Sequence, residues 1–162
     1  MARQKLSYKE GDWFAVPLGP NEYALGVVAR MNGRGGILGY FFGPKFEVVP
    51  PLETTEGLTV KGAIFVSKFG DLGFLEGTWK VIGRHGVWRR EEWPIPAFVR
   101  TDVISGKHRK VVYPEDDFST ETQLIPIDPV AAEKLPEDGT FGAGAVELRL
   151  TKLLSIEKSL NT

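Results

Sequence analysis

The clearest indication of the fold lies near the start of the chain, in Tyr8-Lys9-Glu10-Gly11-Asp12-Trp13-Phe14-Ala15-Val16-Pro17-Leu18. Successive side chains of a strand point to opposite faces of its sheet. One face would therefore carry Phe14, Val16 and Leu18, and the other Trp13, Ala15 and Pro17. Both faces are apolar, which is typical of a strand covered on both sides, as in a small barrel.

Turn residues and short apolar runs continue this pattern along most of the chain. A turn at 19–22 leads into a return strand at 23–31, and an apolar strand at 37–42 is expected to end at Gly43-Pro44. Apolar residues in period two predict a strand at 58–67. Shorter strands are expected at 79–83, 97–103, 109–113 and 123–127. The chain is therefore β-rich over residues 8–127.

The last forty residues have a helical pattern instead. Asp128-Pro129 predicts a helix start, because an aspartate can accept from the first free N–H groups and proline is tolerated in the first helical position. A longer amphipathic helix is expected at 145–159, with Val146, Leu150 and Leu153 on one stripe. We therefore expect one α+β, mostly β domain over residues 1–162. Its β part would form a bent antiparallel sheet or partly open barrel, with helices from 128–160 packed on one side.

The composition excludes several classes of protein. The 162 residues carry a formal net charge of −1, which gives no global attraction to nucleic acid or anionic lipid. The chain has no cysteine, so disulfides, thiolate metal sites and a cysteine nucleophile are excluded. It contains no apolar run of about 18 residues that could span a membrane, and the first residues lack a signal-peptide pattern. These features favour a cytoplasmic location.

Residues suited to catalysis or metal binding are sparse. His85 and His108 are the only histidines, and neither has a ligand partner at helical spacing. Asp71 and Glu76 flank a turn, but such carboxylate pairs arise by chance among 21 acidic residues. Residues 142–144 lack the third glycine and the lysine of a phosphate-binding loop. We therefore predict no enzyme activity, no metal and no cofactor.

Charge is distributed unevenly between two neighbouring stretches. Residues 84–110 contain seven bases and three acids, and residues 115–138 contain eight acids and one base. The acidic stretch is either an ordinary solvated surface or a surface that attracts a basic partner. Within it, Glu115, Asp116 and Asp117 follow a proposed hairpin strand and are expected to project into solvent.

Two tryptophans lie within the basic stretch. Trp88 and Trp93 flank charged residues, so partial exposure is expected for both. Partly exposed tryptophan is common at the centres of protein interfaces. These two residues and the three acids at 115–117 are the candidate partner-binding residues.

Several stretches, in their order along the chain, together resemble the immunity protein 26 family of bacterial polymorphic toxin systems. They are residues 11–18, 23–26, 36–42, 69–73, 79–84 and 88–96. The similarity extends over residues 8–115 and adds nothing for the last forty residues. The resemblance implies a mostly β fold and neutralisation of a toxin encoded beside the protein, and it carries no catalytic residues.

The leading hypothesis is an immunity protein that binds a cognate toxin domain and blocks its active site, without turnover. The acidic stretch suggests a basic toxin domain, such as a nuclease, as the partner. The alternative is a nucleic-acid-binding β-barrel that uses the basic stretch and its aromatic residues. The low net charge and the acidic stretch argue against that alternative, so nucleic acid is not the expected partner.

Overall fold

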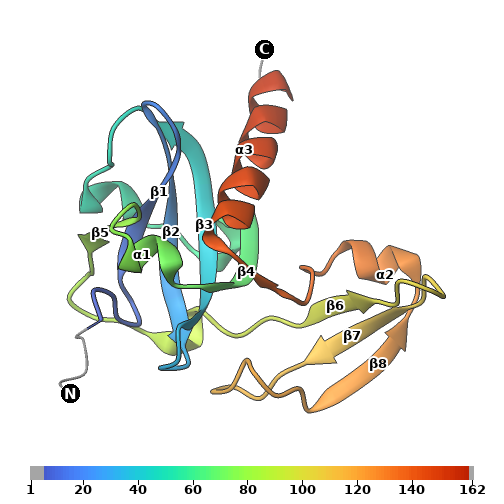
Figure 1. Ribbon diagram of the computed structural model, residues 1–162. Coiled ribbons are helices and arrows are strands. Elements are labelled where there is room, and N and C mark those ends of the chain that lie inside the picture. Colours follow the sequence, from blue (N-terminus) through green and yellow to red (C-terminus); the bar gives the residue numbers. More distant parts are fainter. Residues whose placement is uncertain (1–5, 161–162) are drawn as a thin grey trace.

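A computed structural model describes residues 6–160, with side chains through residue 155, and contains a large sheet, a small sheet and a long C-terminal helix (Figure 1). The large sheet has the strand order β5-β1-β2-β3-β4-β9. Its strands are β1 (Trp13–Gly19), β2 (Glu22–Met31), β3 (Gly36–Phe46), β4 (Phe65–Gly70), β5 (Lys80–Gly83) and β9 (Thr140–Phe141). All neighbouring strands are antiparallel except β4 and β9.

The large sheet is bent and remains open. Register shifts occur in the β1–β2, β1–β5 and β2–β3 pairs, and an extra residue in one strand increases the local twist. The prediction of an α+β, mostly β fold with a bent antiparallel sheet is confirmed. The sheet does not close into a barrel, because its two edge strands do not pair with each other. Strand β5 pairs with β1, and β9 pairs with β4.

The small sheet extends to one side of the large one (Figure 1). It has the order β6-β7-β8, with β6 (Phe98–Thr101), β7 (His108–Val112) and β8 (Gln123–Ile127). The predicted hairpin and the predicted final strand therefore exist, but in a sheet of their own. Helix α2 (Pro129–Glu133) packs on this sheet, and Asp128 Oδ1 accepts from the N–H of Ala131 at 2.7 Å, as the N-cap prediction requires.

Helix α3 (Ala143–Leu160) covers one face of the large sheet. Its buried stripe consists of Ala143, Val146, Leu150 and Leu154. The prediction that Leu153 belongs to this stripe is wrong, because the row continues from Leu150 at a spacing of four residues to Leu154, which is 3% exposed. None of the helices among the described residues combines the length and apolarity that a membrane crossing requires.

Strand β1 divides the interior into two cores, as its two apolar faces predict. Phe14 and Val16 join the core under α3, and Trp13 joins the core on the opposite face. The second core is covered by the segment at 88–95 and by the small sheet, through residues such as Phe98 and Val111. This arrangement buries both faces of the large sheet.

Three predicted strand boundaries are wrong. The strand expected at 97–103 ends at Thr101, so Val103 lies in the following turn. The strand expected at 58–67 is replaced by a 3₁₀ turn, η2 (Val60–Gly62), followed by β4, which begins at Phe65. Strand β3 does not end at Gly43-Pro44 but continues to Phe46. The remaining short helices are α1 (Leu72–Leu75), η1 (Leu52–Thr55) and η3 (Arg90–Glu92).

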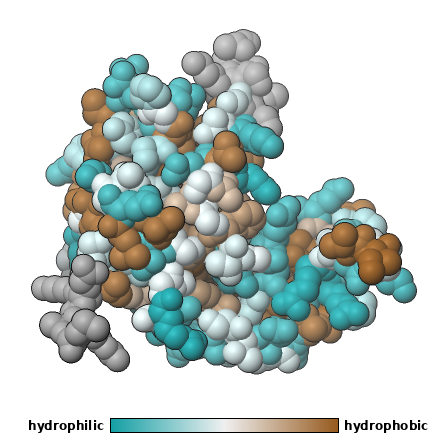
Figure 2. Space-filling view, in the orientation of Figure 1, coloured by the Kyte–Doolittle hydropathy of each residue, from teal (hydrophilic) through white to brown (hydrophobic). Residues whose placement is uncertain are grey.

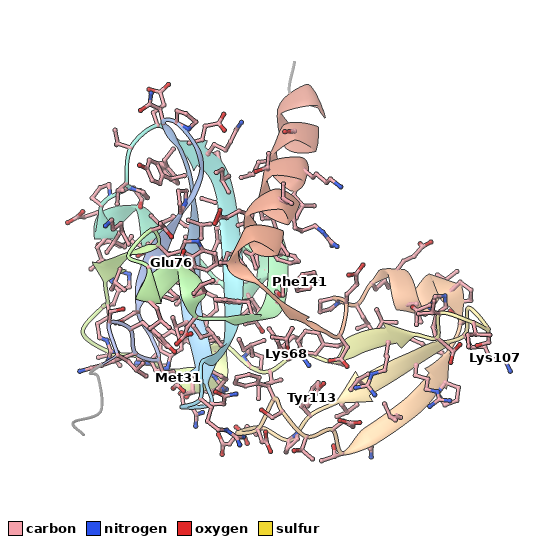
Figure 3. All side chains as sticks on the ribbon, viewed as in Figure 1. Met31, Lys68, Glu76, Lys107, Tyr113 and Phe141 are labelled. Carbon is pink, nitrogen blue, oxygen red and sulfur yellow. The ribbon has the colours of Figure 1, made fainter. Side chains whose placement is uncertain are left out.

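A buried polar cluster joins the two sheets. Lys68 of β4 donates to Tyr113 Oη at 2.7 Å and to Asp138 Oδ1 at 2.6 Å, and Lys68 and Tyr113 lie between the sheets in Figure 3. The Tyr113 hydroxyl also donates to Asp138 Oδ1, and Arg100 of β6 donates to Asp138 Oδ2 at 2.7 Å. Although burial opposes ionisation, these hydrogen bonds hold the pKa of Asp138 below its ordinary value. The small sheet is thus fixed to the large sheet by charged groups.

Candidate functional site

Trp93 lies in the second core and not at the surface. Its side chain is 5% exposed, and its ring contacts Trp13 edge-on at a centroid distance of 5.7 Å. The guanidinium of Arg30 in β2 donates to the Trp93 carbonyl at 2.9 Å, and the Tyr40 hydroxyl of β3 donates to the Pro94 carbonyl. The expected partial exposure of Trp93 is therefore wrong, because this segment is fastened across the face of the large sheet.

Trp88 is partly exposed, as predicted, and lies on top of Trp93. The two rings stack with centroids 6.0 Å apart and an interplanar angle of 13°. The indole Nε1 of Trp88 donates to Glu10 Oε2 at 2.9 Å. Trp88 therefore presents part of its ring to solvent from a fixed position.

Arg90 joins this tryptophan to the acidic stretch. Its Nε lies 2.9 Å from Glu10 Oε2, and its Nη1 donates to Asp116 Oδ1 at 2.6 Å. Glu10 thus accepts a hydrogen bond from Trp88 and forms an ion pair with Arg90, and Arg90 reaches from Glu10 to Asp116. The structure brings Trp88 and Asp116, 28 positions apart in the sequence, to one surface.

The acidic loop at 115–117 has the exposure that the sequence predicts. Glu115, Asp116 and Asp117 are all exposed, and Phe118, 5% exposed, holds the loop on the second core. The carboxylate of Asp117 accepts from the Ser119 N–H at 2.8 Å. Among the described side chains, Glu115 and Asp117 form no ion pair. We refer to Glu10, Trp88, Arg90, Glu115, Asp116 and Asp117 as the tryptophan–acid surface.

A shallow hollow of about 240 Å³ lies beside the tryptophan–acid surface. Trp13, Trp88 and Trp93 form its aromatic wall, and His85 and Glu92 also line it. The His85 Nε2 atom lies 2.6 Å from Thr55 Oγ1, whose hydroxyl donates to the Leu52 carbonyl. His85 is thus held by a structural hydrogen bond. Trp93 is part of the wall of the hollow although its side chain is only 5% exposed.

Some of the bases in the basic stretch form ion pairs with acidic residues. Arg84 pairs with Asp12 at 3.0 Å, and Arg100 pairs with Asp138 at 2.7 Å and Glu121 at 3.4 Å. With Arg90 paired to Glu10 and Asp116, three of the seven bases of residues 84–110 have acidic partners. The basic and acidic stretches therefore neutralise each other in part.

The other titratable candidates are scattered over the molecule. His108 lies in β7, with its Nδ1 2.8 Å from Thr101 Oγ1, and Asp71 accepts from the Tyr8 hydroxyl at 2.8 Å. Glu76 follows α1 and is exposed. In the part of the chain that the structure describes, no three His, Cys, Asp or Glu residues form a group that could hold a metal ion.

Sequence reasoning missed the linking roles of Glu10 and Arg90. In the sequence, Arg90 is only one of the seven bases of residues 84–110, and Glu10 lies 80 positions before it. No local pattern reports a contact between residues so far apart. Only the fold reveals that both residues support the candidate partner-binding residues.

Comparison with known protein families finds a match. The family model for immunity protein 26 matches residues 9–110, which includes Glu10, Trp88 and Arg90 and ends before the acidic loop. No curated protein and no solved structure matches the chain. The match spans more than half of the chain, from before strand β1 into β7. The chain therefore belongs to the immunity protein 26 family, which implies binding and neutralisation of a toxin.

Proposed function

We propose that this protein binds the catalytic domain of a cognate bacterial toxin through the tryptophan–acid surface and neutralises it by covering its active site. The observation that carries the proposal is the link from Trp88 through Glu10 and Arg90 to Asp116. It supports a fixed, partly apolar anchor beside a group of exposed carboxylates. That combination is typical of the centre and rim of a protein interface.

The carboxylates favour a basic toxin domain, such as one that acts on nucleic acid. Glu115 and Asp117 are exposed and have no ion-pair partner among the described side chains, whereas Asp116 shares Arg90 with Glu10. Exposed charges of one sign accelerate the association of oppositely charged proteins by about 10- to 1,000-fold. They also compete with substrate phosphates for a basic groove.

Inhibition would then follow from steric exclusion. A typical stable interface buries about 1,600 Å² in total, enough to cover an active-site cleft. Trp88 would lose its remaining exposure in the complex, and the hollow beside it would accept a side chain of the toxin. No bond is made or broken in this scheme, so one chain neutralises one toxin molecule. In this scheme the protein binds the toxin in the cytoplasm, and the two proteins belong to a bacterial polymorphic toxin system.

The nucleic-acid-binding alternative has less support. It needs a basic surface that includes the aromatic residues, yet Arg84, Arg90 and Arg100 are paired with acids and the acidic loop lies next to Arg90. The unpaired Lys107, Arg109 and Lys110 belong to the hairpin of the small sheet and not to the segment that carries Trp88 and Trp93. Phosphate binding draws its affinity from unpaired lysine and arginine side chains that displace counterions. We therefore do not propose this function.

A titration of toxin activity tests the proposal. The toxin domain encoded beside this gene is assayed on its substrate with increasing amounts of the purified protein. We expect activity to fall linearly to zero at one equivalent, and inhibition to be competitive with substrate when the complex is made weaker by high salt. Complete neutralisation by a small fraction of an equivalent would contradict a binding mechanism. Inhibition that substrate cannot relieve would contradict active-site occlusion.

A further inference from the structure

The hairpin between β6 and β7 ends in two apolar side chains that touch nothing. Val103 and Ile104 are each 99% exposed, more than any other large hydrophobic residue among the described residues. They form part of the apolar group at the free end of the small sheet in Figure 2. Two adjacent and fully exposed large apolar side chains are removed from water only when a partner covers them, which is favourable, so this protruding tip is a candidate contact.

The tip is ordered by its own hydrogen bonds. The Asp102 carboxylate accepts from the N–H groups of Ile104 and Ser105, both at 2.8 Å, and these bonds lower the pKa of Asp102. The Gly106 N–H donates to the Asp102 carbonyl at 2.9 Å, and Gly106 has a φ of +71°, which glycine adopts without strain. A turn fixed in this way loses little conformational entropy when it binds.

The other end of the small sheet is anchored to the body of the protein. Arg100 in β6 and Tyr113 after β7 both donate to Asp138, which pairs with Lys68 of the large sheet. The hairpin therefore extends from a fixed base. Such an arm can hold Val103 and Ile104 in place before a partner arrives.

Basic residues follow the apolar tip. They are Lys107, Arg109 and Lys110, and none of them forms an ion pair with another described residue. Figure 3 places Lys107 at the outer end of the small sheet. A pocket that receives this tip should accordingly be apolar inside and acidic at its rim.

We propose that Val103 and Ile104 insert into an apolar pocket of the toxin domain, whose acidic rim is separate from the basic surface that meets the acidic loop, as a second contact at the opposite end of β7 from that loop. This inference rests on the proposed function. The tip lies at one end of β7, and the acidic loop follows the other end. The chain advances by eleven residues from Ile104 to Glu115, which span at most about 36 Å when extended, and a small domain is about 30 Å across. The two contacts are therefore separated by about the width of one small domain at most, so one toxin domain can reach both.

Two other occupants fit the tip less well. A second copy of the chain would need an interface of about 1,200 Å² or more, and two side chains on a narrow turn supply a small part of that area. A membrane surface is usually contacted by tryptophan or tyrosine, and residues 102–107 contain no aromatic side chain. A protein pocket suits two compact, branched aliphatic groups.

The double variant V103S/I104S tests the inference. The probe is the toxin domain encoded beside this gene, made inactive by mutation, and its binding is measured by calorimetry. Because both side chains are fully exposed, the variant should melt at the same temperature as the wild type. We expect its Kd for the toxin domain to rise at least tenfold. The control V48S/L148S removes two exposed apolar residues elsewhere, at 69% and 68% exposure, and should change Kd less than twofold.

The outcomes separate this inference from the proposed function. If the wild type binds the toxin domain and V103S/I104S binds equally well, the tip inference is wrong and the proposed function stands. If the wild type does not bind, the proposed function fails. Two further assays use the same variant. The first measures sedimentation of the protein with vesicles of phosphatidylglycerol and phosphatidylcholine, and the second measures self-association in the ultracentrifuge. If the wild type binds the vesicles or self-associates and V103S/I104S does not, the assignment of the tip to a toxin pocket is wrong.

Discussion

The guanidinium of Arg90 donates to the carboxylate of Asp116 at 2.6 Å and so joins the most basic stretch of the chain to the most acidic one. The sequence presents these stretches as two surfaces of opposite charge, but the fold places them in contact. The charge available to a partner is consequently carried by Glu115 and Asp117, with Asp116 partly neutralised. Experiments on the acidic loop should therefore treat Asp116 separately from its neighbours.

Removing the acidic loop's charges should slow toxin binding without unfolding the protein. In the variant E115S/D116S/D117S the melting temperature should stay nearly unchanged, because an exposed ion pair contributes about 0–1 kcal/mol. The association rate with the toxin domain should fall severalfold at low salt and converge with wild type at high salt. Stopped-flow fluorescence measures this rate, and E115S/D117S should account for most of the effect.

A control for net charge is available in the variant E47S/E53S/E76S. These three glutamates are exposed and have no ion-pair partner among the described residues, so the variant loses the same formal charge elsewhere. It should bind almost as fast as the wild type. Equal association rates for both triple variants at low salt would refute a specific role for the acidic loop.

The stability of the core beneath α3 should depend strongly on Phe41. This ring is fully buried and contacts Phe14, Phe69 and Trp79 with centroid distances of 5.4 to 6.5 Å. Phe41→Ala should lower the free energy of unfolding by about 3–5 kcal/mol, because the removed ring leaves a cavity. Urea unfolding followed by tryptophan fluorescence gives this value. Val48→Ala, at an exposed site, should change it little, and a Phe41→Ala loss no larger than that of the control would contradict the assigned packing.

The polar cluster between the sheets predicts a dependence of stability on pH. Asp138→Ala leaves the buried Lys68 ammonium without its partner and should destabilise the protein by about 3–5 kcal/mol at neutral pH. The pKa of Asp138 is lower in the folded state than the value of about 3.9 expected in the unfolded chain. Its stabilising contribution is therefore complete above that value and disappears as the pH falls through the folded-state pKa.

Thermal melts of wild type and Asp138→Ala between neutral and strongly acidic pH check this prediction. The difference in melting temperature between the two proteins should be largest near neutral pH and should become smaller in acid. Asp117→Asn, a substitution at an exposed position of the acidic loop, should melt at nearly the same temperature as the wild type at every pH. A difference that stays constant down to the most acidic pH would show that ionised Asp138 is not the stabilising species.

Close packing between β1 and β2 should make Gly26 intolerant of a side chain. A Cβ at this position would lie 2.5 Å from Cζ of Phe14. Gly26→Ala should therefore destabilise the protein by about 1–3 kcal/mol through overpacking. At Gly86 a Cβ would meet no atom within 4 Å, so Gly86→Ala provides the control. Chemical denaturation of both variants should separate them, and equal stabilities would show that Phe14 can move aside.

Local patterns in the sequence predicted the parts of the fold that depend on neighbouring residues. The two faces of β1, the start of α2 at Asp128 and the strand Gln123–Ile127 all follow from side-chain alternation or from capping chemistry. The end of β3 did not follow, because Pro44 is tolerated beside the register shift between Tyr23 and Leu25 of β2. The placement of the small sheet against the large one could not be predicted either, since it depends on the contacts of Lys68 with Tyr113 and Asp138, 45 and 70 positions away.

The candidate site could be predicted only in its components. The exposure of the acids at 115–117 followed from their polar character and their place after a strand. The burial of Trp93 did not, because its flanking charges gave no sign that Arg30 binds its carbonyl from β2. The same charged surroundings are compatible with the partly exposed Trp88 and the buried Trp93. Tertiary hydrogen bonds, and not composition, distinguish the two tryptophans.

Trp88 should be the apolar anchor of the tryptophan–acid surface. Trp88→Ala removes the stacked ring over Trp93 and the hydrogen bond to Glu10, and it should speed dissociation of the toxin domain at least tenfold. Trp88→Phe keeps an aromatic ring in the stack but removes the indole N–H, so it should retain most of the affinity. Surface plasmon resonance gives the dissociation rates, and thermal melts show how far each variant remains folded. If Trp88→Ala stays folded and dissociates as slowly as the wild type, Trp88 is not an anchor, and toxin binding must depend on the acidic loop and the hairpin tip.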